Sequence, residues 1–213
     1  MEKCSQRLYK FKLMMKAHEL DFPLFDDTWS WSGASVLLRT EAHLILIKRS
    51  LSMPTHPGQM AFIGGHKKSD ELHPFEVAQR EFEEESAHHR DAIKCVGLLR
   101  PVYTARGQSI VPVVAELMMD VQTFLQQAKS NGEWDHMIAL PWDKINRPEF
   151  WNYAEVRSHS TYQILMTTIA AKSYLHHAEK NDADFVLWGA TARMVWSYLA
   201  LYYQSSSRFN HAP

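Results

Sequence analysis

The feature that most constrains this chain is an acidic run, REFEEES, inside the stretch Gly64–Ala87. Residues three and four apart share a face of an α-helix, so the carboxylates of Glu81, Glu84 and Glu85 are predicted to project together. Such close like charges repel each other, and Arg80 can neutralise only part of them. A divalent cation would neutralise the rest, and all-oxygen ligands suit Mg²⁺ or Mn²⁺ rather than zinc. A solvated acidic helix face is the alternative for this pattern alone.

Two adjacent glycines, Gly64 and Gly65, precede this helix and follow a short apolar segment, Met60–Ile63, that suits a strand. Glycine permits backbone angles and close approaches that a side chain would prevent. Glu71 comes six residues after Gly65, and Arg80 opens the sequence REFEEE nine residues later. Together these residues resemble the box of the Nudix hydrolase family, with one extra residue between Glu71 and Arg80.

Several further segments are similar to the coenzyme A pyrophosphatase branch of that family. LILIKRS at 44–50 and GQMAFIGG at 58–65 resemble the branch patterns L-L-x-x-R-S and G-Q-x-x-F-P-G-G. Downstream, VPVV at 111–114 and LWGATAR at 187–193 are similar to its P-V-V and I-W-G-x-T-A-R sequences. The resemblance covers about residues 35–203.

The local pattern predicts strands and helices that agree with this resemblance. On the box helix, apolar side chains such as Phe82 form the buried side, which leaves Arg80 and the glutamates on the opposite side. Alternating and β-branched runs predict strands, and the last apolar period predicts a helix. The expected elements are strands at 35–39, 44–49, 93–99, 110–117 and 162–169, and helices at 74–87 and 190–203.

The resemblance implies an α+β fold, a Nudix-type α/β/α sandwich with a mixed central sheet on which the box helix packs. One Nudix hydrolase domain is expected at residues 35–204. An N-terminal helix and loop at 1–34 would pack on it, and a tail would follow at 205–213.

The resemblance also implies how the site works. Water attacks one phosphorus of a diphosphate while Glu81 and Glu85 hold Mg²⁺ or Mn²⁺. Glu84 would complete the metal ligands, and Gly65 would offer its carbonyl oxygen. Arg80 would orient the glutamates through an i, i+4 pair with Glu84. The candidate general base is Glu133, with Glu84 as its competitor.

Substrate contacts are expected from five residues upstream of the helix: Arg49, Ser50, Gly58, Phe62 and Gly64. For Arg49, the alternative to anion binding is a surface cation at the end of a strand. The resemblance favours a phosphate contact, since the 3′-phosphate of coenzyme A needs a cation. The predicted reaction is therefore hydrolysis of coenzyme A or its thioesters to 3′,5′-ADP and a 4′-phosphopantetheine product.

Three positions depart from the branch pattern. Pro54 stands where the branch has an arginine, Ile63 replaces the proline before the glycines, and Ala87 replaces the glycine that ends the box helix. The missing arginine leaves ADP-ribose, or another nucleoside diphosphate linked to a small group, as an alternative substrate. A Nudix-fold nucleotide-binding protein without turnover is a further alternative, which the intact Arg80 and box glutamates disfavour.

Composition limits the remaining classes of function. The net charge of −1 over 213 residues disfavours binding of long nucleic acid and suits a small-molecule diphosphate substrate. The only cysteines, Cys4 and Cys95, form no C-x-x-C pair, which favours a reducing compartment and a cytoplasmic location. No apolar run approaches the ~18 residues of a membrane span. A homodimer is left open, and Trp29, Trp31 and Trp134 are candidates for stacking on adenine.

Overall fold

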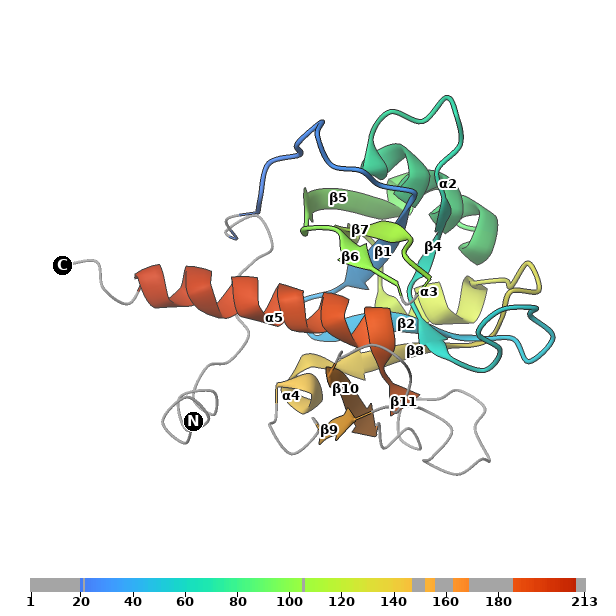
Figure 1. The fold of residues 1–213 in the computed structure, drawn as a ribbon. Coiled ribbons are helices and arrows are strands. Elements are labelled where there is room, and N and C mark those ends of the chain that lie inside the picture. The colour runs from blue at the N-terminus through green and yellow to red at the C-terminus, as the bar shows by residue number, and fades with distance from the viewer. Residues whose placement is uncertain are drawn as a thin grey trace.

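The computed structural model describes residues 20, 22–104, 106–146, 152–155, 163–168 and 186–209 (Figure 1). Its centre is a sheet whose main path runs β3-β2-β1-β7-β5, with three further strands paired beside that path. The strands of this sheet are β1 (Gly33–Arg39), β2 (His43–Arg49), β3 (Met60–Ala61), β4 (Ile63–His66), β5 (Ile93–Leu98), β6 (Val102–Tyr103), β7 (Ser109–Leu117) and β8 (Trp134–Pro141).

The sheet is mixed, because β1 pairs in parallel with β7 while its other strand pairs are antiparallel. All seven residues of β1 are buried, as expected of a strand that is covered on both faces. Successive side chains alternate between the faces. Val36 packs in the cluster that contains Phe82, and Leu37 packs in the cluster that contains Tyr198.

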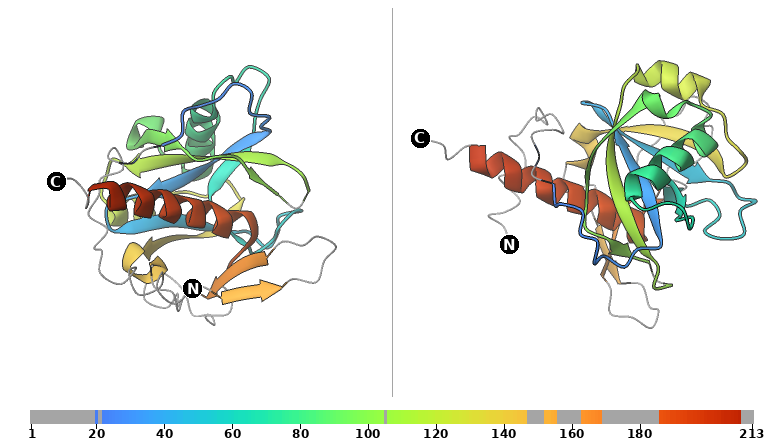
Figure 2. Two further views of the ribbon diagram at one scale, coloured as in Figure 1. Left: turned by 60° about the vertical axis from the view of Figure 1, so that its left-hand side comes forward. Right: turned by 90° about the horizontal axis from the view of Figure 1, so that it is seen from above.

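Helices cover both faces of the sheet (Figures 1 and 2). On one face lie α2 (Pro74–Ser86) and α3 (Val121–Gln127), and on the other lies the long α5 (Gly189–Phe209). The remaining elements are η3 (Arg90–Ala92), α4 (Trp142–Ile145) and a three-stranded sheet of β9 (Asn152–Glu155), β10 (Gln163–Thr168) and β11 (Val186–Leu187). The predicted α+β sandwich with a mixed sheet is thereby confirmed.

Local signals explain where α2 begins and ends. His73 accepts a hydrogen bond from the Phe75 amide (3.2 Å), and Glu76 accepts one from the His73 amide (3.0 Å), so the two residues form a capping box. Pro74 occupies the first turn, where its missing N–H costs nothing. At the other end, Ala87 adopts the left-handed conformation with φ 58°, the conformation for which glycine is preferred.

The buried side of α2 is wider than the sequence predicts. Val77, Ala78 and Phe82 are buried, as expected from the apolar pattern. Glu81 and Glu85 are buried as well, so their placement on a side opposite to the packed residues is wrong. Only Glu84 of the three remains largely in solvent, because β4 packs against the side of the helix that carries the other two.

The other predicted elements agree with the structure within a few residues at each end. The last helix is longer than predicted, since α5 continues through positions 205–209 of the expected tail. The N-terminal helix predicted before residue 20 lies outside the described residues. Of the helices that the structure does describe, none has both the length and the apolar character needed to cross a bilayer.

Candidate active site

The carboxylate of Glu81 lies directly against the backbone of β4. An ideal Cβ on Gly65 would come within 2.1 Å of Glu81 Oε1, so this position accommodates the carboxylate only because it is glycine. Arg80 Nη1 donates to the same oxygen at 2.5 Å. Burial raises the pKa of Glu81, and the charges of Glu84 and Glu133 raise it further, whereas the bond and charge of Arg80 oppose that shift.

Glu85, one helical turn further on, is only 1% exposed. Its Oε1 accepts a hydrogen bond from the Gly64 amide at 2.9 Å, but its Oε2 has no partner among the described residues. Burial raises the pKa of Glu85 to about 8; the charges of Glu133 and Glu81 add to this, and the Gly64 bond and Arg49 oppose it. An ionised carboxylate in this position needs a positive partner.

These observations fit a divalent cation held by Glu81 and Glu85. Two buried carboxylates, one with an unpartnered oxygen, are hard oxygen donors of the kind that Mg²⁺ and Mn²⁺ bind. The described residues do not, however, contain three His, Cys, Asp or Glu side chains grouped closely enough to form a metal site as they stand. Further ligands would therefore come from water, from the Gly65 carbonyl, or from a movement of Glu84 or Glu133.

Arg80 is fixed by a residue to which the sequence assigns no role, Glu71. Arg80 Nε and Nη2 donate to the two carboxylate oxygens of Glu71 at 2.7 and 3.1 Å. Arg80 Nη2 also donates to the His66 carbonyl at 2.9 Å. Such a bidentate pair fixes the plane of the guanidinium relative to the plane of the carboxylate. The pair lowers the pKa of Glu71 and raises the pKa of Arg80. The spacing from Glu71 to Arg80 in the box was the sequence signal for this contact.

Glu84 lies at the outer edge of the same cluster, where its side chain is 48% exposed. The predicted i, i+4 contact is present, with Arg80 Nη1 3.2 Å from Glu84 Oε2. Lys68 Nζ lies 3.3 Å from the other carboxylate oxygen. Because Glu84 is solvated, its ion pairs are weak, and it exchanges partners at lower cost than the buried Glu81.

The sheet brings Glu133 to this cluster from a distant part of the sequence. Strand β8 pairs with β2 so that Trp134 lies opposite Arg49, and the Ser50 amide donates to the Glu133 carbonyl at 2.8 Å. The Glu133 charge contributes to the raised pKa of both Glu81 and Glu85. The predicted general base and the predicted metal ligands are therefore neighbours.

The expected substrate residues divide into two groups. Arg49 is half-buried, and its charge opposes the raised pKa of Glu85. Gly58, with φ 70°, donates its amide to the Arg49 carbonyl at 3.1 Å, so the 50–58 loop closes beside Arg49. Ser50 is buried, and its Oγ lies 3.0 Å from Ser52 Oγ. The amide of Gly64 is already bonded to Glu85.

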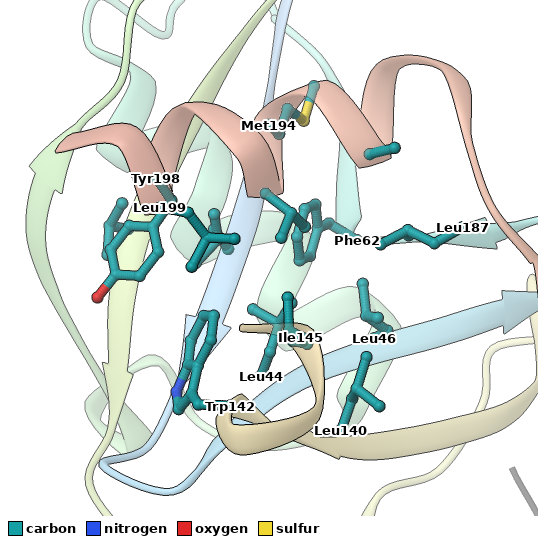
Figure 3. Close-up of a cluster of buried hydrophobic side chains, with 14 of the residues drawn as sticks. Leu44, Leu46, Phe62, Leu140, Trp142, Ile145, Leu187, Met194, Tyr198 and Leu199 are labelled. Atoms are coloured by element: carbon teal, nitrogen blue, oxygen red, sulfur yellow. The ribbon is translucent and has the colours of Figure 1, made fainter. Parts of the chain in front are cut away.

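Phe62 belongs to the second group, because the structure places its ring away from the carboxylates. The side chain is buried in the cluster under α5, together with Leu46 and Leu187 (Figure 3). Since Glu81 and Glu85 belong to the opposite face of the sheet, a direct contact between the Phe62 ring and a ligand at those carboxylates is not supported. Its role there is core packing.

The three tryptophans proposed for adenine stacking make contacts with other side chains or with the backbone of the protein. Trp134 is buried, and its Nε1 donates to the Glu85 carbonyl at 2.7 Å, so its prediction as a stacking platform is wrong. Trp29 and Trp31 pack edge-on against Phe25 at 5.9 and 6.5 Å, and Lys67 Nζ lies 4.2 Å from the Trp31 ring centre.

Comparison with known proteins identifies the family. The model of the NUDIX domain matches residues 30–167, and the chain therefore belongs to the Nudix family. It is similar to the protein named uncharacterized Nudix hydrolase NudL of Escherichia coli (strain K12), with 34% identity over 99 residues, 45% of this chain and 52% of that protein. The corresponding protein of Enterobacter sp. (strain 638) is 36% identical over 83 residues, 39% of this chain and 43% of its own length.

The chain thus spans about half the length of the curated relatives it matches. Among solved structures, it is similar to a Nudix hydrolase of M. smegmatis, RenU, with 20% identity, a TM-score of 0.42, and coverage of 54% of this chain and 73% of that one. The expected membership of the Nudix family is confirmed; the coenzyme A branch is not distinguished by these matches.

Proposed function

We propose that this protein is a metal-dependent Nudix pyrophosphohydrolase that cleaves the diphosphate bond of coenzyme A or its thioesters. The observation that carries the proposed chemistry is the cluster at β4 and α2. There the buried Glu85, with its unpartnered Oε2, lies beside Glu81 and within electrostatic reach of Glu133. Burying carboxylates without a full set of partners destabilises a fold, so this arrangement is explained by a bound cation better than by packing.

Glu81 and Glu85 would hold Mg²⁺ or Mn²⁺, with the Gly65 carbonyl as a further candidate ligand. When bound, the cation supplies charge neutralisation at the diphosphate oxygens and lowers the pKa of water. Arg80, fixed by Glu71, keeps the Glu81 carboxylate in place.

In this proposal Glu133 accepts the proton of the attacking water. It lies in the turn directly before β8 rather than on α2, and therefore approaches the water from a different direction than the metal ligands. Glu84 is the competitor for that role, since it is solvated and lies on the same side of the helix as Arg80.

The choice of coenzyme A rests on the resemblance of the upstream segments and on Arg49. A guanidinium is always charged and forms two parallel hydrogen bonds to phosphate, and Arg49 lies at the end of β2, next to the strand that follows Glu133. This residue would contact the 3′-phosphate of the adenosine. Arg106, exposed in the β6–β7 loop, is a second candidate.

One observation favours the alternative substrates. Pro54 is exposed in the loop where the branch pattern has an arginine, so this loop offers one cation fewer than the branch. ADP-ribose, or another nucleoside diphosphate linked to a small group, lacks the 3′-phosphate and would not need that cation. A homodimer and a cytoplasmic location stay predictions.

A substrate panel tests the proposal. The purified protein would be incubated with coenzyme A, dephospho-coenzyme A, ADP-ribose, NADH and nucleotide sugars in Mg²⁺ and in Mn²⁺, and the products would be identified by mass spectrometry. We expect 3′,5′-ADP and 4′-phosphopantetheine from coenzyme A, and no product after chelation. A more than tenfold preference in kcat/KM for ADP-ribose or a nucleotide sugar would overturn the substrate but leave the diphosphate chemistry. Nucleotide binding that stabilises the protein without any product would favour a binding protein.

A further inference from the structure

The C-terminal end of α2 is the point where this helix meets the segment that carries Glu133. The last four carbonyls of a helix have no partner inside the helix. In α2 the Glu83 carbonyl accepts from the Ala87 amide at 3.2 Å, within the cap itself. The two carbonyls nearest the end accept from outside: Glu85 from Trp134 Nε1 at 2.7 Å, and Ser86 from the Lys129 amide at 3.1 Å.

The indole of Trp134 is built into this junction. Its side chain is 9% exposed and packs in the same cluster as Phe82 and Phe124. A buried indole N–H needs a hydrogen-bond acceptor, and the acceptor is the backbone carbonyl of the very residue whose side chain is the buried carboxylate. The ring therefore fixes the distance between β8 and the end of α2.

The turn that precedes Trp134 is tied at several further points. Ser130 Oγ donates to the Trp134 carbonyl at 2.6 Å and accepts from the Gly132 amide at 3.0 Å. On its other side, the Glu133 carbonyl accepts from the Ser50 amide at 2.8 Å. The register between β2 and β8 shifts between Lys48 and Arg49, and such an irregularity re-aims the side chains next to it.

We propose that Trp134 is a positioning residue, whose indole hydrogen bond to the Glu85 carbonyl holds Glu133 in the orientation in which it accepts a proton from the attacking water. Glu133 precedes Trp134 directly, so the indole bond anchors the chain at the residue that follows Glu133. The Ser50 amide holds the Glu133 carbonyl, and the Asn131 side chain bonds the Glu133 amide and carboxylate at 3.0 and 3.2 Å. The inference rests on the proposed function, because it assigns a purpose to Glu133 of the same site.

The test removes the indole hydrogen bond together with part of the ring volume, and the matched control loses the same volume. Trp134→Phe keeps an aromatic ring in the cluster and removes the indole N–H. We expect kcat for diphosphate hydrolysis to fall about ten- to a hundredfold, as misplacement of a catalytic group by about 1 Å does. KM should stay within about twofold of wild type, and the increase in Tm produced by Mg²⁺ within about 1 °C, because the carboxylates of Glu81 and Glu85 keep their bonds to Arg80 and to the Gly64 amide.

Trp142→Phe is the matched control. Trp142 is also buried, at 2% exposed, and its Nε1 donates to the Thr40 carbonyl at 3.1 Å, in the cluster on the other face of the sheet. This variant loses the same kind of bond, and we expect a comparable decrease in Tm with kcat within about twofold of wild type. A merely structural role of Trp134 predicts that both variants behave alike, and that result would overturn the inference.

A double-mutant cycle separates action through Glu133 from any other effect. In a Glu133→Gln background, Trp134→Phe should lower kcat no further, since the group it positions is already lost. An undiminished effect in that background would contradict the inference. Should Trp134→Phe not fold, Ser130→Ala decides instead: it acts on the same turn from the exposed side, and unchanged kcat there would count against the inference.

The same experiments distinguish this inference from the proposed function. A wild-type protein that cleaves no diphosphate overturns both. An active wild type with an equally active Trp134→Phe variant overturns the inference alone.

Discussion

Replacing Glu85 by glutamine should change how the stability of the metal-free protein depends on pH. Burial raises the pKa of Glu85 from its usual 4.5 to about 8. The unfolded chain therefore ionises this group above about pH 4.5, while the folded protein keeps it protonated until about pH 8. Its contribution to folding is most favourable below pH 4.5 and is lost as the pH rises to about 8.

The structure gives the size of this effect. Each pH unit between the two pKa values changes the free energy of unfolding by about 1.4 kcal/mol, so the total over the interval from 4.5 to about 8 is on the order of 5 kcal/mol. Glutamine is neutral at both ends of the range, and its carbonyl oxygen can still accept the hydrogen bond that the Gly64 amide donates to Glu85. The variant should therefore lack this part of the pH dependence.

This pH dependence is measured by urea denaturation of both proteins at pH 5 and at pH 8, in the presence of a chelator. The free energy of unfolding of wild type should fall by several kcal/mol relative to Glu85→Gln between the two pH values. Using the difference between the two proteins removes the titration of the histidines, which both share. Excess Mg²⁺ at pH 8 should then raise the free energy of unfolding of wild type, by about 2.7 kcal/mol at a hundredfold excess over Kd. The free energy of unfolding of the variant should not change.

Glu83→Gln serves as the control on the same helix. Glu83 pairs with Arg90 at 2.6 Å on the solvent side and contacts neither Glu81 nor Glu85 in the described hydrogen bonds. It should respond to pH and Mg²⁺ as wild type does. A difference between wild type and Glu85→Gln that stays constant from pH 5 to pH 8, or an equal Mg²⁺ response in both, would refute the reasoning.

Three shorter predictions follow from the same geometry. Gly65→Ala should weaken Mg²⁺ binding about ten- to a hundredfold, measured as the Mg²⁺ dependence of Tm, because a Cβ would come within 2.1 Å of Glu81 Oε1; unchanged affinity would remove Glu81 from the ligands. Ala87→Gly should stabilise the protein by roughly 0.5–1 kcal/mol in urea denaturation, since φ 58° suits glycine, and any destabilisation counts against that argument. Glu133→Gln should lower kcat about a hundredfold with the Mg²⁺-induced rise in Tm unchanged; wild-type kcat would shift the base to Glu84.

Much of the fold was predictable because its signals are local. The strands of the central sheet are apolar runs with turns between them, and α2 has a proline in its first turn and a capping pair at His73 and Glu76. The contact between Arg80 and Glu84 also follows from helical spacing alone. These features depend on residues within a few positions of each other, so local sequence patterns predict them.

Phe62 shows where local reasoning fails. It lies between β3 and β4, strands of two and four residues, which are too short to reveal by alternation which side chains face which side of the sheet. The resemblance suggested a substrate contact, whereas packing against Leu46 and Leu187 turns the ring toward α5. Trp134 could be mistaken for a stacking platform for another reason, because the Glu85 carbonyl that its indole bonds is 49 residues away in the sequence.

The sequence by itself determined the helix that carries the glutamates, the glycine that leaves room for Glu81, and the family to which the chain belongs. Only the tertiary structure decided that Glu81 and Glu85 are buried while Glu84 is not, and that Glu71 fixes Arg80. It also decided that Trp134 joins Glu133 to the end of α2. The physical reason is that burial, and the pKa shifts it causes, depend on which distant strands pack against a side chain, and local spacing carries no information about those neighbours.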